Sequence, residues 1–220
     1  VHFLGFQDNS AGVAMTLAIA KGMIDAGYRP ERTIVFILHG GEEWGAIDTR
    51  YDWSIGAWNQ VNRISPDWPG RALCYINFEH PAHRFGSTYY VKSAVELSDF
   101  LLGFYGQAPD PVELFSAGFA AEGSHLTTWT DAWSYNLAGI PSFNNGGDTL
   151  DTAAEDGTDA AGDDSVEGPE EGMNSYYHSQ FDTPDTWDPA IFGYNLRFFI
   201  DLTTAVDRTP ALEINLAAQV

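Results

Sequence analysis

The sequence predicts an α/β fold, a three-layer α/β/α sandwich with a mixed, largely parallel central sheet. Short apolar runs typical of buried strands alternate with segments in which apolar residues recur at helical spacing. At 220 residues, of which 44% are apolar, the chain is long enough to bury a sizeable core. We therefore expect a single domain over residues 1–220, with an acidic loop insertion at about 148–173.

The expected elements follow the positions of these patterns. Asn9 or Ser10 can cap the first helix, and Gly27 ends it. The last helix carries an apolar stripe that includes Phe192 and Phe199, as expected for a helix packed on a core. The expected helices cover residues 10–26, about 47–63, 94–105, 131–137 and 189–206. The expected strands cover residues 32–38, 72–78, 88–91 and 140–143.

Two adjacent carboxylates, Glu42 and Glu43, come soon after the apolar run 33–38. The carboxyl ends of strands are where α/β proteins place their ligand crevices. Neighbouring buried carboxylates repel each other unless a cation or a proton separates their roles. One interpretation is therefore a metal ligand beside a general base, and the other is a solvated loop that carries two acids.

Three further residues favour the metal interpretation. Asp8 lies just before the first expected helix, Glu79 ends the apolar run 73–78, and His178 lies in a loop ahead of the last helix. Carboxylate oxygens and imidazole nitrogens are common zinc ligands. Together with the paired glutamates, these residues predict a metal site made of oxygen and imidazole ligands.

Five short motifs follow one another along the chain. They are Asp-Asn-x-x-Gly-Val-Ala from Asp8, Gly-Glu-Glu-x-Gly from Gly41, Asn-Phe-Glu from Asn77, Asp-x-x-x-Tyr-x-x-x-Gly-Ile-Pro from Asp131, and Tyr-His-x-x-x-Asp-Thr from Tyr177. Each motif is weak alone, but their order resembles that of the co-catalytic zinc exopeptidases. That family includes bacterial leucyl aminopeptidases and glutamate carboxypeptidases, and the resemblance spans most of the chain.

The resemblance implies a zinc site with two ions. Asp8 would bridge the two ions, and Glu79 would bind the first of them. Glu43 and His178 would complete the second. Zinc is therefore the expected cofactor, and peptides are the expected substrates.

The same resemblance implies the chemistry. Glu42 would be the general base that takes a proton from a metal-bound water. Tyr177 would help to hold the oxyanion of the tetrahedral intermediate. Asp131 would support the site without binding metal.

The sequence departs from the family pattern in two ways. The family has a His-x-Asp motif about ten residues before the bridging aspartate, and counting back from Asp8 runs off the start of the chain. We therefore expect the chain to be an N-terminally incomplete piece, the alternative being a weakened or absent first metal. Glu79 stands where the family commonly has aspartate, and its longer side chain can still reach a metal. His80 and His83 could substitute as ligands, although loop histidines near the pocket are the simpler interpretation.

The net charge of the chain limits the kinds of partner that we expect it to bind. The net charge is −21, which argues against direct binding to nucleic acid or to an anionic membrane. A negative field attracts a free α-amino group and repels a terminal carboxylate, so it favours an aminopeptidase over a carboxypeptidase. Ten of the acidic residues lie in residues 148–171, where the simplest interpretation is a charged surface insertion and the alternative is a lid over the site.

Two rival functions stay open beside the aminopeptidase. One is an enzyme like the glutaminyl cyclases, which share the fold class and use one zinc ion to cyclise. The other is a metal-free binding scaffold, although retaining Asp8, Glu42, Glu43 and His178 would then bury charge for no purpose. No apolar run approaches the roughly 20 residues of a spanning helix. The resemblance suggests a secreted or periplasmic location.

Overall fold

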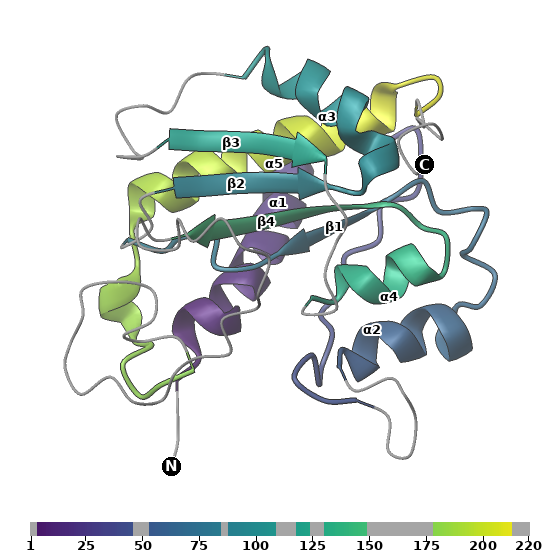
Figure 1. Cartoon of the computed structure of the whole chain (residues 1–220). Helices are drawn as coiled ribbons and strands as arrows, with labels where there is room; N and C mark the ends of the chain where they lie inside the picture. Colours follow the sequence, from purple (N-terminus) through teal and green to yellow (C-terminus); the bar gives the residue numbers. More distant parts are fainter. Residues whose placement is uncertain are drawn as a thin grey trace.

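Four strands form one mixed sheet in the order β1-β4-β2-β3 (Figure 1). The computed structural model describes residues 4–45, 53–84, 88–108, 118–123, 130–148 and 178–212. Strand β1 (Tyr75–Phe78) pairs in parallel with β4 (Ser142–Asp148), and β2 (Thr88–Ser93) pairs in parallel with β3 (Gly118–Gly123). The β2 and β4 strands are antiparallel. The predicted α/β class with a mixed sheet is confirmed.

The helices cover the two faces of this sheet. One core joins α1 (Gly12–Asp25), α3 (Ser98–Tyr105) and α5 (Pro189–Arg208). A second, smaller core joins α2 (Ile55–Asn59) and α4 (Ala132–Leu137).

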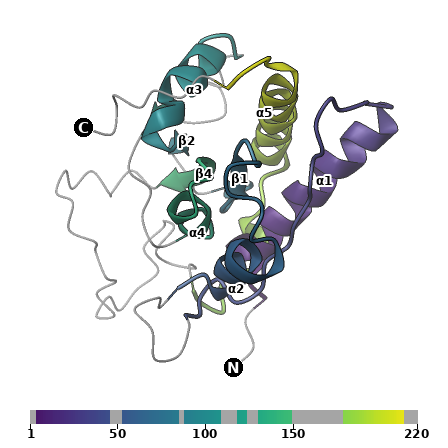
Figure 2. The same ribbon diagram turned by 90° about the vertical axis from the view of Figure 1, so that its right-hand side faces the viewer.

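Strand β1 shows that the two cores lie on opposite faces. Ile76 and Phe78 pack in the first core and Tyr75 packs in the second, as the alternation of side chains along a strand requires. Figure 2 shows α1 and α5 together on one side of the strands and α4 on the other. This arrangement agrees with the predicted three-layer sandwich.

The observed helices differ from the expected ones mainly at their ends. A π-type turn, η1 (Phe6–Ala11), precedes α1 and is broken by the non-helical backbone of Asp8 and Asn9. The second expected helix is α2 followed by another π-type turn, η2 (Gln60–Ile64), and its first part lies outside the described residues. The third expected helix is split into a 3₁₀ turn, η3 (Val95–Leu97), and α3.

The last helix has a well-defined start. A 3₁₀ turn, η6 (Pro184–Thr186), leads into α5, which begins at Pro189 and ends at Arg208. The Asp188 carboxylate accepts hydrogen bonds from the backbone N–H groups of Ala190 and Ile191, at 2.8 and 3.1 Å. This cap satisfies two of the donors that a helix N-terminus leaves free. No helix in the described part of the chain is long and apolar enough to cross a membrane.

The prediction of a strand at residues 32–38 was wrong for the described structure. These residues adopt no regular secondary structure, and none of the described strands is hydrogen-bonded to them. The β3 strand was not predicted. Strand β1 is shorter than expected, and β4 begins and ends later than the expected strand 140–143.

Asp207, near the end of α5, anchors the chain just before this segment. Its carboxylate accepts hydrogen bonds from the Tyr28 hydroxyl at 2.6 Å and from the backbone N–H groups of Glu31 and Arg32 at 3.0 and 2.8 Å. Asp207 is 3% exposed. These hydrogen bonds therefore attach the turn between α1 and residues 33–38 to the C-terminal end of α5.

We expect Asp207→Asn to lower the free energy of unfolding by about 2 kcal/mol, because a carboxamide cannot accept all three hydrogen bonds and buried donors lose their partner. Urea unfolding followed by circular dichroism measures this. Asp201→Asn, at an exposed position of the same helix, is the matched control and should change little. Equal stability of the two variants would contradict this role of Asp207.

Candidate metal centre

Asp8 is held in place by a residue from the other end of the chain. The buried Asp182 carboxylate accepts hydrogen bonds from the backbone N–H groups of Gln7 at 2.8 Å and Asp8 at 3.0 Å. The buried Gln7 side chain in turn donates to the carbonyl oxygens of Ala82 and Thr186, at 3.3 and 3.1 Å. These contacts fix the backbone from which the Asp8 side chain projects.

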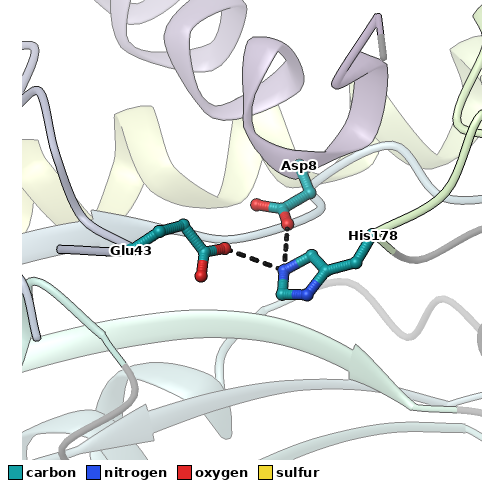
Figure 3. Close-up of side chains that lie close together, drawn as sticks. All are labelled: Asp8, Glu43 and His178. Atoms are coloured by element: carbon teal, nitrogen blue, oxygen red, sulfur yellow. Dashed lines mark ion pairs between the residues drawn. The ribbon is translucent and has the colours of Figure 1, made fainter. Parts of the chain in front are cut away.

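Asp8, Glu43 and His178 converge on one point (Figure 3). His178 Nε2 lies 3.0 Å from Asp8 Oδ2 and 2.8 Å from Glu43 Oε1. The three residues come from the turn before α1, the segment after residues 33–38, and the loop before α5. His178 has a left-handed backbone (φ 54°), a conformation uncommon for residues other than glycine and often found at functional sites.

This cluster fits a divalent cation. One ligand atom from each residue can be chosen so that all lie within 4.8 Å of one another, and two carboxylate oxygens with one imidazole nitrogen are a donor set that zinc accepts. Burial raises the pKa of Asp8, and the nearby Asp182 charge raises it further, whereas His178 lowers it. A cation among these groups would favour their ionised forms.

Glu79 lies outside the cluster of three and is held by two amides. Asn77 Nδ2 donates to Glu79 Oε1 at 2.8 Å, and Asn9 Nδ2 donates to Glu79 Oε2 at 2.9 Å. Burial raises the pKa of Glu79 well above its usual value, and the charges of Glu42 and Asp8 add to this effect. Glu79 is therefore near the other carboxylates, with both of its oxygens already occupied by hydrogen bonds.

Glu42 has a different environment from its neighbour Glu43. Its Oε1 accepts a hydrogen bond from the Trp53 indole N–H at 2.8 Å. Burial, with smaller contributions from Asp131, Glu43 and Asp8, raises the pKa of Glu42 to about 8. A carboxyl group with such a pKa exchanges its proton near neutral pH, which suits a general acid or base.

Asp131 lies beside Glu42 on a cavity of about 900 Å³. The carboxyl group is buried, and burial raises its pKa to about 6. Tyr75 and Tyr135 also line the cavity, and their rings stack with centroids 3.8 Å apart. The Tyr135 hydroxyl lies 3.0 Å from His39 Nε2. The cavity thus joins acidic groups to an aromatic wall.

The other residues singled out in the sequence have varied positions. Tyr177, and the acidic segment 149–173, lie outside the described residues. His80 Nε2 is 3.9 Å from Asp8 Oδ1, and burial lowers the pKa of His80 to about 4. His83 is buried too, and its pKa is lowered to about 3.

Three supporting residues have contacts that the sequence did not predict. Asp182, which holds Asp8, and Asn77, which holds Glu79, had no expected role. Asn9 was expected only as a helix cap, and it also holds Glu79. All three belong to the motifs that were recognised, so the motifs contained a signal for them. What the sequence lacked was any indication of which backbone or side-chain atoms they would contact.

The fold and the cluster together define an α/β protein with a candidate metal centre near Glu79, the residue that follows β1. The sequence matches the model of peptidase family M28 over residues 2–202, and the chain belongs to this family. Its membership confirms the resemblance to the zinc exopeptidases and the predicted class, the metallopeptidases. No curated protein sequence matches the chain.

Solved structures of similar fold include zinc aminopeptidases. The chain is 18% identical to the zinc aminopeptidase BSAP from Bacillus subtilis, with a TM-score of 0.63, over 96% of this chain and 45% of that one. It is also 18% identical to an aminopeptidase from Aneurinibacillus sp. strain AM-1, with a TM-score of 0.63, over 96% and 42%. A glutaminyl cyclase from Porphyromonas gingivalis is 16% identical, with a TM-score of 0.58, over 91% and 63%. The chain thus spans less than half the length of these two aminopeptidases.

Removing the Asp182 carboxylate should disturb Asp8. We expect Asp182→Asn to lower the free energy of unfolding by about 2 kcal/mol, because the carboxamide can accept only one of the two backbone hydrogen bonds. Zinc affinity should fall about tenfold or more, as is usual when a residue that orients a ligand is lost. Calorimetric titration with zinc measures the affinity. Asp185→Asn, exposed and three residues away, is the control, and an equal affinity in both variants would contradict the prediction.

The raised carboxyl pKa values also predict a pH dependence in the metal-free protein. A group whose pKa is higher in the folded than in the unfolded state binds more protons when folded, so stability falls as pH rises between the two values. For Glu42 this interval runs from 4.5 to about 8. We expect Glu42→Gln to lessen the fall in urea midpoint across this range, with chelator present. A pH dependence unchanged from that of Asp201→Asn would show that Glu42 does not titrate in this way.

Proposed function

We propose that the chain is the metal-binding catalytic part of a zinc aminopeptidase. The observation that carries the proposal is the position of His178 Nε2 between the Asp8 and Glu43 carboxylates. Asp8, Glu43 and His178 would hold one zinc ion. Asp8 would also bridge to a second ion, which Glu79 would bind after exchanging one of its amide partners for the metal.

The proposed chemistry assigns separate work to the two adjacent glutamates. When bound, zinc would polarise the scissile carbonyl and lower the pKa of a water molecule. Glu42 would take the proton of that water and pass it to the leaving amine, since it lies by the cluster without belonging to it. The Trp53 N–H fixes the direction in which the Glu42 carboxylate points. Tyr177 is proposed, on its motif alone, as the donor to the oxyanion.

Asp131 is proposed as a supporting residue. It is buried beside Glu42, and its charge raises the pKa of Glu42. A carboxylate in this position would help to keep the proton of Glu42 available near neutral pH. Asp131 is not one of the three residues whose ligand atoms converge, which agrees with a role that does not include metal binding.

An amino-terminal substrate suits the charge of the site. The cavity beside the cluster is lined by Asp8, Glu42, Glu43 and Asp131, and the whole chain carries a net charge of −21. Such a field attracts the α-amino group of a peptide. The aminopeptidases among the similar structures support the same substrate class. We further propose a single catalytic domain and, from the resemblance to the family, a secreted or periplasmic location.

A cyclase that uses one zinc ion is the second candidate. One observation favours it: the described ligands gather around one position, while both oxygens of Glu79 are engaged by Asn9 and Asn77. The fold is also similar to that of a glutaminyl cyclase. Zinc content and product distinguish the two enzymes, because the cyclase would bind one ion and release no amino acid.

The two glutamates give a direct test of the proposal in the intact protein. Glu42→Gln should lower the turnover of leucine p-nitroanilide by a factor of 10² to 10⁴ and leave zinc affinity within a few-fold, because it removes a proton acceptor but no ligand. Glu43→Gln is the matched variant and should lower zinc affinity itself. Unchanged turnover in Glu42→Gln would remove Glu42 from the mechanism, and cyclisation of an N-terminal glutamine without hydrolysis would favour the cyclase.

A further inference from the structure

Three side chains on one face of β1 form a continuous line of hydrogen bonds that ends at Glu79. Tyr75 and Asn77 occupy alternate positions of β1, and Glu79 continues the alternation directly after the strand. Alternate side chains of a strand point to the same face. The Tyr75 hydroxyl donates to Asn77 Oδ1 at 2.9 Å, and Asn77 Nδ2 donates to Glu79 Oε1 at 2.8 Å. The strand thus holds the carboxylate at its end through residues of its own face.

The Asn77 side chain can present only its N–H groups to Glu79. Its register partner on β4, Asn144, accepts a second hydrogen bond from Asn77 Nδ2 at 2.9 Å. With the amide flipped, the Asn77 oxygen would face two acceptors, Glu79 and Asn144. Asn77 is 5% exposed, and unmet hydrogen bonds are costly at such a buried position. The Asn144 carbonyl and the Tyr75 hydroxyl therefore fix the direction in which this amide points.

The second amide on Glu79 comes from a different segment, the one that carries Asp8. Asn9 directly follows Asp8, and its Nδ2 donates to Glu79 Oε2 at 2.9 Å. The same Nδ2 donates to the Phe78 carbonyl oxygen at 2.8 Å, and Asn9 Oδ1 accepts from the Gly12 N–H at 3.0 Å. These two hydrogen bonds would keep Asn9 in place if it lost Glu79. An ion shared with Asp8 would approach Glu79 from this side.

We propose that Asn77 and Tyr75 are positioning residues for the zinc ion that Glu79 binds. Asn77 holds Glu79 by Oε1, and Tyr75 acts through Asn77 by fixing its amide. Glu79 Oε2 then exchanges the Asn9 amide for the ion that it shares with Asp8. The inference rests on the proposed two-ion site and adds to it two residues that bind no ion themselves.

Packing alone is the simpler role for Tyr75. Its ring stacks on that of Tyr135 in the second core, with centroids 3.8 Å apart and an angle of 2° between the ring planes. The two hydroxyls, however, have different partners. The Tyr75 hydroxyl donates to Asn77, whereas the Tyr135 hydroxyl lies 3.0 Å from His39 Nε2. Tyr135→Phe is therefore a matched control, because it removes a hydroxyl from the same stack but leaves the line of hydrogen bonds to Glu79 intact.

Zinc binding at buffered free concentrations tests the proposal. The zinc bound per chain is counted at each concentration, and Glu79→Gln identifies the binding step that belongs to the Glu79 ion. We expect the dissociation constant of that step to rise about tenfold to a hundredfold in Asn77→Leu and about three- to tenfold in Tyr75→Phe, as when residues that orient a metal ligand are lost. The step of the other ion should not change, and Tyr135→Phe should change neither step.

Equal zinc binding by Tyr75→Phe and Tyr135→Phe would overturn the proposal, and so would an equal loss of both ions in Tyr75→Phe. If Asn77→Leu does not fold, Tyr75→Phe decides between these outcomes. One ion per chain in the unsubstituted protein would refute the two-ion site itself, and the inference with it. In a crystal structure with zinc bound, Asn77 should still donate to Glu79 and Asn9 should not. The reverse would overturn the choice of oxygen.

Discussion

The Asp182 carboxylate holds together the two ends of the described chain, and the candidate metal centre depends on it. It accepts hydrogen bonds from the backbone N–H groups of Gln7 and Asp8, which are more than 170 residues away in the sequence. His178, only four residues before Asp182, therefore lies next to Asp8, and their side chains are 3.0 Å apart. Because Asp182 is buried and charged, its hydrogen bonds are stronger than those between neutral groups. This one carboxylate thus sets the distance between two of the three clustered ligands.

Crowding of acidic groups gives the site its chemical character. Asp8, Glu42, Glu79 and Asp131 all have raised pKa values, and burial is the largest cause for each. Keeping so many carboxylates in one place is costly unless protons or cations balance them. Zinc bound by Asp8, Glu43 and His178 would supply that balance, while Glu42 would stay free to exchange a proton.

Local sequence patterns predicted much of the fold, and the rest depended on contacts between segments that are distant in the sequence. The helical spacing in α1 and α5 and the apolar run ending at Phe78 were sufficient to place these elements, because periodicity reports which face is buried. Residues 33–38 have an equally strong strand pattern, yet a strand also needs a partner, which no pattern within the segment can specify. Likewise, Glu79 was recognised from its motif, but its contacts with Asn9 and Asn77 depend on how α1 meets β1.

Anomalous X-ray diffraction at the zinc absorption edge, on crystals of the intact protein grown with zinc, tests the central claim most directly. We expect an anomalous peak within bonding distance of Asp8, Glu43 and His178, at about 2.0–2.2 Å from their oxygen and nitrogen ligands. A second peak beside Asp8 and Glu79 would establish the two-ion site. A well-ordered cluster without a peak, in crystals that bind zinc elsewhere, would contradict the assignment of these three residues as a metal centre.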